Sequence, residues 1–352
     1  MNILRYIGNE KLLYDLVAGF PSAILLIIMA ACLIVLAKGA DWMIDGVVEL
    51  AHRTGLPRIV IGATVISLGT TTPEAVVSVM AAWMGNPGLA LGNGVGSMIA
   101  NTGLIFGMTC LLTTVPMNRY ILNRTGWVQD GAATLLVAIS VVLLVSMSGK
   151  PILNRWVGFV LLFLLSLYMY ITYVWAKGID TETVDGEKTD NADYASLSRC
   201  WTLILGGLFC VAVGARFLVP CAAELAKRIG VPDDVVAATL VAFGTSLPEL
   251  MTAIAAVRKG HPEITVGNIV GANVLNILFV VGGAAAASPL LVPSNFYSLH
   301  FPVMLFILYS FRVFVIIEKG GRFRRWQGGW LLGIYLSYLI YQYAFSFGSG
   351  IS

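Results

Sequence analysis

One segment of this chain occurs twice, and both copies carry the same costly feature. Residues 56–107 and 231–282 align without a gap at an offset of 175, and 17 of the 52 aligned positions are identical. Each copy places a glutamate directly after a proline within an apolar stretch, Glu74 in the first copy and Glu249 in the second. A carboxylate among apolar residues is costly to bury, so its presence in both copies points to a functional site.

The composition places both copies in a membrane. Apolar residues make up 58% of the chain and charged residues 12%, and the mean hydropathy is +0.84. Soluble domains carry about 25% charged residues, so an ordinary soluble fold is excluded. The length corresponds to about ten membrane helices of about 20–25 residues each. We therefore expect an all-α integral membrane protein in contact with the lipid bilayer, and the net charge of +3 gives no support for nucleic-acid binding.

Ten apolar stretches are long enough to be membrane helices. They lie near residues 21–48, 58–84, 87–113, 127–147, 151–176, 200–226, 232–257, 263–287, 297–317 and 327–347. Between the fifth and the sixth, residues 178–199 contain six acidic and only two basic residues, a composition that cannot bury a core. The sequence therefore predicts a five-helix half (1–177), an acidic flexible linker (178–199) and a second five-helix half (200–352).

Basic residues predict how the chain is oriented in the membrane. With the N-terminus outside, the loops of one side hold 14 Lys and Arg residues, Arg312 among them, and those of the other side hold 6. Cytoplasmic loops are enriched in Lys and Arg, so both termini should lie outside and the linker in the cytoplasm. Because each half has an odd number of helices, the second half would be inverted relative to the first. Secondary transporters are commonly built in this way, with the binding site at the midplane between the repeats.

The first shared motif surrounds the glutamates and covers residues 67–74 and 242–249. Proline has no N–H, so Pro73 and Pro248 leave the carbonyl four residues earlier without its helical partner and kink the helix. Glycine, threonine and serine residues precede each proline. A kink alone would be a structural feature that membrane helices tolerate. The adjacent glutamate in both copies instead favours a functional cluster of backbone carbonyls, hydroxyl groups and a carboxylate.

The second shared motif covers residues 92–101 and 267–276. Its glycines recur at a spacing of four, which lets neighbouring helices approach closely. Its polar residues recur at the same spacing and therefore form one stripe on each helix. The stripes are Asn93, Ser97 and Asn101 in the first copy, and Asn268, Ala272 and Asn276 in the second. The first residue of each stripe fits interhelical hydrogen bonding as well as ion binding, whereas Ser97, Asn101 and Asn276 favour an ion site.

Every atom of the first motif that could bind a metal ion is an oxygen. A hard cation such as Ca²⁺ takes roughly six to eight oxygen ligands, carboxylates among them, and Na⁺ is likewise satisfied by carbonyl and hydroxyl oxygens. A soft metal would require cysteine or histidine, and neither occurs in this motif. The residues therefore predict a site for hard cations around Glu74 and Glu249, and no cofactor is expected.

At these residues the chain resembles the sodium/calcium exchanger family of the cation/calcium antiporter superfamily, and in particular its prokaryotic members. That family has two inverted repeats with G-[TS]-S-x-P-[ED] and G-S-N-x-x-N elements in a ten-helix architecture. The similarity here covers residues of about 33–113 and 208–288. The resemblance implies that Glu74 and Glu249 are the central acidic ligands. Further implied ligands are the side chains of Thr70, Thr71, Ser97, Asn101, Thr245, Ser246 and Asn276, and the backbone carbonyls of Ser67, Thr70, Ala242 and Thr245.

The chain departs from the family pattern at positions that bear on the ions carried. Ala272 replaces a serine and removes a hydroxyl, Met98 stands where the first copy usually has asparagine or a small residue, and Thr71 replaces serine. Asn276 is an amide where potassium-dependent members carry aspartate, which weakens a potassium-dependent function. Proton/calcium members typically have G-N-x-x-E, so the threonine-proline form found twice here favours sodium as the coupling ion.

The resemblance implies a secondary active antiporter that exchanges Na⁺ for Ca²⁺ by alternating access in a prokaryotic inner membrane. A Ca²⁺/H⁺ or K⁺-dependent exchanger on the same scaffold is the nearest alternative. A cation channel is a more distant one, because channels usually arrange several subunits around a pore. An enzyme is not expected, since the sequence shows no nucleophile–base pair, phosphate-binding loop or Cys/His metal set. The expected partners are metal cations and lipid, and the sequence indicates no protein partner.

Overall fold

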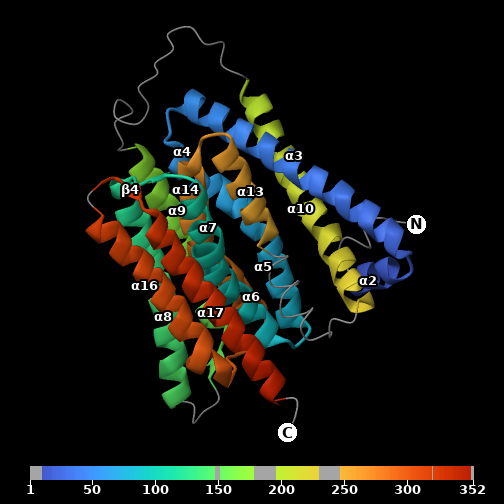
Figure 1. Ribbon diagram of the computed structural model, residues 1–352. Helices are drawn as coiled ribbons and strands as arrows, with labels where there is room; N and C mark the ends of the chain where they lie inside the picture. The colour runs from blue at the N-terminus through green and yellow to red at the C-terminus, as the bar shows by residue number, and fades with distance from the viewer. Residues whose placement is uncertain (1–9, 147–150, 178–195, 230–245, 319, 350–352) are drawn as a thin grey trace.

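The computed structural model describes residues 10–146, 151–177, 196–229, 246–318 and 320–349. In chain order its elements are α2 (Glu10–Ala18), α3 (Ser22–Thr54), α4 (Arg58–Ile61), η1 (Gly62–Ile66), α5 (Ser67–Trp83), α6 (Pro87–Ala100), η2 (Asn101–Phe106), α7 (Gly107–Leu112), β1 (Val115–Pro116), α8 (Arg119–Ser146), β2 (Ile152–Leu153), α9 (Arg155–Lys177), α10 (Leu197–Arg228), α13 (Leu247–Arg258), α14 (Pro262–Leu275), η5 (Asn276–Val281), α15 (Gly282–Ala287), β3 (Leu290–Leu291), η6 (Phe296–His300), α16 (Phe301–Ile317), β4 (Arg322–Phe323) and α17 (Arg325–Ser349). Figure 1 shows the helices gathered in one bundle, with the long α3 and α10 packed together along one side. The expected all-helical membrane fold is confirmed.

Eight of the ten expected spans are seen as helical runs that are long and apolar enough to cross a bilayer. Within the described residues they are Ser22–Thr54, Arg58–Trp83, Pro87–Leu112, Leu122–Ser146, Arg155–Trp175, Leu197–Leu225, Pro262–Ala287 and Phe296–Ile317. The span expected at 232–257 falls largely on residues outside the description, and α13 is its end. The span expected at 327–347 corresponds to α17, which has 25 residues and is not among those eight. The count of ten helices stays a prediction.

The first span ends later than its apolar stretch. α3 continues past residue 48 to Thr54 and stops at Gly55, whose φ of 68° is readily adopted by glycine. The Gly55 N–H bonds the carbonyl of Ala51 and closes the last turn. The short helix α2, which precedes this span, was not predicted because it is only nine residues long.

The second half begins inside the expected linker. α10 starts at Leu197, because the Ser196 hydroxyl accepts a hydrogen bond from the Arg199 N–H and caps the helix. Most of the expected linker, with the acidic residues and the flexibility predicted for it, lies at 178–195 and is outside the described residues.

The repeated sequence segments fold alike. At the offset of 175, α6, η2 and α7 of the first copy correspond to α14, η5 and α15 of the second, and β1 corresponds to β3. In each copy the helix widens into a π-helical turn that begins at an asparagine, Asn101 or Asn276. Such turns within α-helices are frequent at functional sites. A third π-helical turn, η1, ends directly before Ser67, and its counterpart would fall on residues outside the description.

The strands tie the two halves of the chain together. β1 pairs antiparallel with β4, with Val115 opposite Phe323, and β2 pairs antiparallel with β3, with Leu153 opposite Leu290. Each pair joins a strand from residues 1–177 to one from 200–352. The neighbouring helices pack in the same reciprocal way, α9 against α15 and α17 against α7. Each half therefore packs extensively against the other.

Helix α14 is the most enclosed part of the bundle. Of the apolar stretch within Pro262–Ala287, 83% is buried, more than in any of the other seven candidate spans of the described residues. A Cβ on Gly267 would collide with the Ile59 carbonyl, and one on Gly271 would collide with the Ala63 carbonyl. α14 therefore crosses α4 and η1 with the backbones in contact, as the spacing of its glycines predicts.

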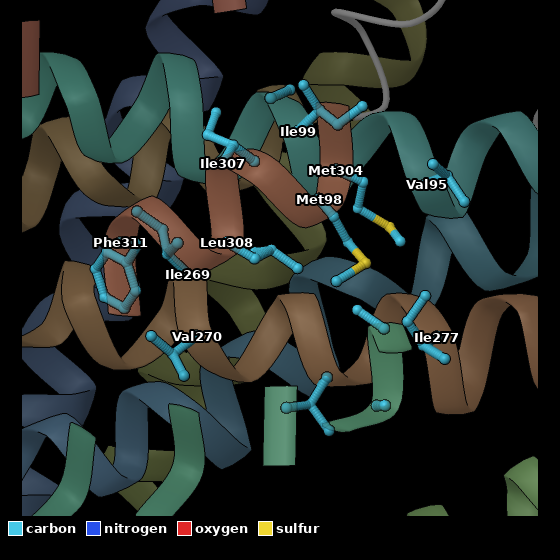
Figure 2. Packing of buried hydrophobic residues seen from close by; sticks show 14 of the residues in the cluster. Val95, Met98, Ile99, Ile269, Val270, Ile277, Met304, Ile307, Leu308 and Phe311 are labelled. Atoms are coloured by element: carbon cyan, nitrogen blue, oxygen red, sulfur yellow. The ribbon is translucent and has the colours of Figure 1, made fainter. Parts of the chain in front are cut away.

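An apolar core lies between α6, α14 and α16. Figure 2 shows the side chains that meet there: Val95, Met98, Ile99, Ile269, Val270, Ile277, Met304, Ile307, Leu308 and Phe311. Met98 is fully buried in this cluster. The equivalent residue of the second copy, Asn273, instead bonds Thr102 and Gln129. The two copies differ at this position because their neighbours differ.

Candidate cation-binding site

The first copy of the Pro-Glu motif, residues 67–74, lies in the interior of a helix. Glu74 follows Pro73 inside α5 and is fully buried. Ser67, Thr70 and Thr71 of the same helix are also fully buried, so the motif directs its polar groups into the bundle. The π-helical turn η1 precedes this stretch, and Pro73 removes one backbone hydrogen bond within it. The helix is therefore irregular where its polar side chains gather.

In the second copy of the motif, the Pro-Glu pair lies at the beginning of a helix. α13 begins at Leu247, and Glu249 is in its first turn and fully buried. Within the described residues Pro248 therefore lies in the first turn of a helix and does not kink one. The N–H groups of a first turn have no partner within the helix, so a proline there removes no hydrogen bond. The positive end of the helix dipole favours a carboxylate at this position. The predicted ligand Thr245 and the predicted carbonyl of Ala242 lie outside the described residues.

Two serines join the two copies of the motif beside the glutamates. The Ser97 hydroxyl donates to Glu74 Oε1 at 2.8 Å, and the Ser246 hydroxyl donates to the Ser97 oxygen at 3.4 Å. The carboxylates of Glu74 and Glu249 are close enough to repel each other. The copies of the Pro-Glu motif, far apart in the sequence, therefore meet in one place.

Two neighbouring threonines differ in what their hydroxyls contact. Thr70 Oγ1 is within hydrogen-bonding distance of two carbonyls of its own helix, at 3.2 and 3.4 Å, and of Asn268 Oδ1 at 3.5 Å. Thr71 Oγ1 has no hydrogen-bond partner among the described residues. Both hydroxyls lie beside the Glu249 carboxylate without reaching hydrogen-bond geometry. The Ser67 hydroxyl turns away to the Thr64 carbonyl at 3.3 Å.

Buried oxygen atoms without a hydrogen-bond partner are concentrated in the two motifs. Eight such oxygens are found within the described residues, and six of them are in the motifs: Thr71 Oγ1, Glu74 Oε2, Asn101 Oδ1, both carboxylate oxygens of Glu249, and Asn276 Oδ1. The other two, the hydroxyls of Tyr168 and Thr172, are in α9. The segments that carry the six motif oxygens pack on one another, α5 against α6 and η5, and α13 against η2. An unpaired buried acceptor costs about 1–3 kcal/mol, and a charged one costs more. Such a set of oxygens, two carboxylates included, fits a hard cation.

Asn93, for which two roles were open, makes hydrogen bonds between helices. Its Nδ2 donates to the Glu74 carbonyl at 3.0 Å and to Ser78 Oγ at 2.9 Å. Asn93 therefore fastens α6 to α5 and holds the backbone of Glu74 in position. Asn268 also makes a contact between helices, but as an acceptor, because its Oδ1 lies 3.5 Å from Thr70 Oγ1. The fully buried Ala272 supplies no side-chain oxygen.

Replacing Asn93 by leucine should weaken the contact between α5 and α6. We expect Asn93→Leu to lower the free energy of unfolding by about 1 kcal/mol, because an interhelical hydrogen bond in a membrane protein contributes about 0.6–1.7 kcal/mol. The measurement is denaturant-induced unfolding of the purified protein in detergent micelles. Thr72→Val is the matched control, since the Thr72 hydroxyl bonds only the Leu68 carbonyl of its own helix. Equal stability of the two variants would contradict the role given to Asn93.

Polar residues that the sequence did not predict extend the site into α8 and α16. Asn273, Gln129, Asp130 and Arg312 are all buried and are joined by hydrogen bonds. A signal for them was available, because each of the last three lies within an apolar span. The count of basic residues above places Arg312 in a loop. The structure corrects this, because Arg312 lies inside the bundle and pairs with Asp130.

Known proteins resemble this chain over most of its length. The profile of the family described as "Sodium/calcium exchanger protein" matches residues 23–174 and 200–344. An uncharacterised membrane protein of Methanocaldococcus jannaschii is 31% identical over 86% of this chain and 93% of its own length. The sodium/calcium exchanger MaX1 of Methanosarcina acetivorans is 29% identical over 89% of this chain and 97% of its own. The solved structure of the sodium-calcium exchanger NCX_Mj, soaked with 2.5 mM Na⁺ and 10 mM Sr²⁺, matches with a TM-score of 0.75 at 28% identity, covering 91% of this chain and 99% of that chain.

Proposed function

Because the chain belongs to the sodium/calcium exchanger family, a family of transporters rather than enzymes, we propose that it exchanges Na⁺ for Ca²⁺ across the membrane by alternating access. The observation that carries this proposal is the pair of fully buried carboxylates, Glu74 and Glu249, which lie together among oxygen atoms without partners. One Ca²⁺ neutralises both charges. Na⁺ ions can bind the same oxygens, so the two ions compete for one site.

The residues that bind the ions in this proposal come from both copies of the repeat. They are the side chains of Glu74, Glu249, Thr70, Thr71, Ser97, Asn101, Thr245, Ser246 and Asn276, together with the backbone carbonyls of Ser67 and Ala242. Support is strongest for the residues with an unpartnered buried oxygen and for Ser97, which bonds Glu74 directly. The Thr70 and Ser67 hydroxyls have backbone partners, so these residues would contribute mainly carbonyl oxygens.

The proposed architecture has ten membrane helices in two inverted halves, residues 1–177 and 200–352. A cytoplasmic linker joins them, and both termini lie outside a prokaryotic inner membrane. The equal offset of α6–α7 and α14–α15 and the reciprocal strand pairs support the inverted repeat. Removing Arg312 from the 14 basic residues of the inner side leaves 13 against 6, so the bias toward the cytoplasm persists.

Exchange rather than leakage follows from the charge of the site. Two carboxylates close together in the bundle repel each other unless a cation or a proton neutralises them. A conformational change that moves this site past apolar surroundings is therefore favourable only when the carboxylates are occupied. The protein would then return to its first conformation only after Na⁺ has replaced Ca²⁺ in the site, and this requirement couples the two fluxes.

Reconstituted protein should take up Ca²⁺ into liposomes that are loaded with Na⁺ and diluted into Na⁺-free medium. The measurement is ⁴⁵Ca²⁺ uptake, repeated with K⁺ and H⁺ gradients of equal size. Uptake is expected with the Na⁺ gradient alone, and it should disappear when an ionophore dissipates that gradient. Uptake driven by a pH gradient without Na⁺ would indicate a Ca²⁺/H⁺ exchanger instead. A requirement for K⁺ would indicate a K⁺-dependent exchanger, and flux without any counter-ion gradient would indicate a channel.

A further inference from the structure

A buried ion pair lies next to the candidate site and takes no part in the exchange described above. Asp130 of α8 and Arg312 of α16 are 2% and 3% exposed, and Arg312 Nε donates to Asp130 Oδ2 at 2.7 Å. Charged residues within membrane spans are rare because they are costly, and they usually serve a function. Stability alone does not explain the pair, because a buried ion pair is often no more stable than apolar residues of the same size.

Helix α8 holds the guanidinium of Arg312 in one orientation. Nη1 donates to the Leu122 carbonyl at 3.2 Å, and the guanidinium carbon lies 4.6 Å from the centroid of the Trp127 ring. Gly126 leaves the space that the guanidinium occupies, because a Cβ there would collide with it. With Arg312 fixed on one oxygen of Asp130, the other oxygen is an acceptor with a fixed direction.

A chain of hydrogen bonds leads from Asp130 to the candidate site. Gln129 Nε2 donates to Asp130 Oδ1 at 3.3 Å, and Asn273 Nδ2 donates to Gln129 Oε1 at 3.2 Å and to Thr102 Oγ1 at 2.8 Å. Asn101 Nδ2 donates to Asn273 Oδ1 at 3.4 Å. All five residues are buried. The last oxygen of this hydrogen-bond chain, Asn101 Oδ1, has no partner in the described part of the protein and belongs to the oxygens of the candidate site.

This chain of hydrogen bonds has a direction, because every amide nitrogen in it points toward the ion pair and every amide oxygen points toward the candidate site. A carboxylate only accepts hydrogen bonds, so Gln129 must turn its nitrogen to Asp130, and each following amide must turn the same way. We propose that the Asp130–Arg312 pair acts through Gln129 and Asn273 to position Asn101 with its oxygen, not its nitrogen, toward the transported cation. This role rests on the proposed function of the same site.

The orientation of Asn101 decides whether this residue attracts or repels a cation. Its oxygen is a cation ligand, whereas its NH₂ group would place partial positive charge against the ion. In the equivalent asparagine of the second copy, Asn276, neither Oδ1 nor Nδ2 forms a hydrogen bond with any described residue. The counterpart of Asn273 in the first copy is the apolar Met98, which cannot orient an amide. Asn101 is therefore positioned by its surroundings in a way that Asn276 is not.

The isosteric change Asp130→Asn should reverse the direction of the hydrogen bonds between Asp130 and Asn101. The new amide would give its oxygen to Arg312 and its nitrogen to Gln129, and Gln129, Asn273 and Asn101 would then turn in sequence. We expect Ca²⁺ to bind about 10–100-fold more weakly, the usual effect of losing the group that orients a metal ligand. The measurement is isothermal titration of the purified full-length protein in detergent with CaCl₂. Unchanged affinity would overturn the proposal.

A compensating change separates orientation from folding. In the double variant Gln129→Glu/Asp130→Asn, the new carboxylate again accepts from Asn273, and the new amide joins it to Arg312. We expect the double variant to bind Ca²⁺ close to wild-type affinity, although it carries one substitution more than Asp130→Asn. Ser140→Ala is the control on the same helix, because the Ser140 hydroxyl bonds only the Leu136 carbonyl, and it should not change the affinity.

Breaking the hydrogen-bond chain tests whether Asp130 acts by orienting the amides or by the effect of its charge through space. Asn273→Met copies the residue of the first repeat, removes the link, and should itself weaken Ca²⁺ binding. Once the link is gone, Asp130→Asn should cause little further loss, so the two effects should not add. Full additivity would overturn the proposal in favour of an effect through space. Asn273→Met also tests the proposal by itself if Asp130→Asn does not fold.

The same measurements distinguish failure of this role from failure of the proposed function. Wild-type protein that binds Ca²⁺ without Na⁺-driven uptake would overturn exchange, while the comparison of variants would still decide the role of the ion pair. Variants that bind Ca²⁺ as the wild type does would overturn the role of the ion pair and leave exchange intact. Wild-type protein that binds no Ca²⁺ would overturn both.

Discussion

The single variants Glu74→Gln and Glu249→Gln should each bind Ca²⁺ at least about 100-fold more weakly than the wild type, and neither should take up Ca²⁺ under a Na⁺ gradient. Glutamine keeps the shape of the side chain and removes its charge. Two unit charges about 4 Å apart attract each other by about 4 kcal/mol at an effective dielectric constant of about 20, which is far more than a neutral amide oxygen supplies. Titration with CaCl₂ and ⁴⁵Ca²⁺ uptake measure the two effects.

A surface carboxylate provides the matched control for these variants. Glu224 pairs with Arg228 one turn later on α10 at 2.8 Å, and both side chains are partly exposed. Because such a pair contributes roughly 0.2–1 kcal/mol, Glu224→Gln should bind and transport Ca²⁺ as the wild type does. Thermal unfolding gives a second readout, since an ion bound only by the folded protein raises its Tm. Ca²⁺ should raise the Tm of the wild type and of Glu224→Gln, but not that of either site variant. Uptake that survives Glu74→Gln or Glu249→Gln would refute the assignment of the site.

The centre of the proposed site could be chosen from the sequence because its residues are rare in their surroundings. A glutamate within an apolar span has few structural explanations, and its recurrence at a fixed offset removes most of those that remain. Ser97 was predictable for a related reason, since helical spacing placed it on one stripe with Asn101. The structure brings Ser97 to Glu74 and leaves Asn101 Oδ1 without a partner among the described residues, which is consistent with the proposed ion site.

The support around the site was not predictable from spacing. Asp130 and Arg312 lie 182 residues apart, and only the packing of α16 on α8 brings them together. Each looks like an isolated polar residue in its own span, and Arg312 lies near enough to a span end to be taken for a loop residue. The direction of the amides between Asp130 and Asn101 depends on which atom each neighbour presents, and that information exists only in three dimensions.

The sequence predicts part of the contact of α14 with α4 and η1, and the structure supplies the rest. Helical spacing predicts that Gly267 and Gly271 admit a close neighbour, and the structure identifies that neighbour as the backbone at Ile59 and Ala63. The contact is reciprocal, because a Cβ on Gly62 would lie 2.7 Å from the Ile264 carbonyl. Backbone atoms cannot move aside as a side chain can.

The smallest change at this contact should therefore have a large effect. We expect Gly271→Ala to lower the free energy of unfolding by about 1–3 kcal/mol through overpacking, and to abolish Na⁺-driven Ca²⁺ uptake. The second effect follows from position, because α14 leads directly into Asn276, and η1 leads directly into the stretch that ends at Glu74. A shift between these elements moves ligands of the two copies relative to each other. Unfolding in detergent and ⁴⁵Ca²⁺ uptake test the two effects.

Gly329→Ala in α17 is the matched control, because Gly329 is exposed and a Cβ there meets no atom within 4 Å. Alanine is favoured over glycine in a helix by about 1 kcal/mol, so this variant should be as stable as the wild type or more stable, and it should transport Ca²⁺ normally. The same chemical change thus has opposite expected effects at two helical glycines. If Gly271→Ala proved as stable and active as Gly329→Ala, the close approach of α14 to η1 would not be what holds the halves of the site in register. The register would then depend on other contacts between the halves, such as those of Ser246 with Ser97 and of Asn101 with Asn273.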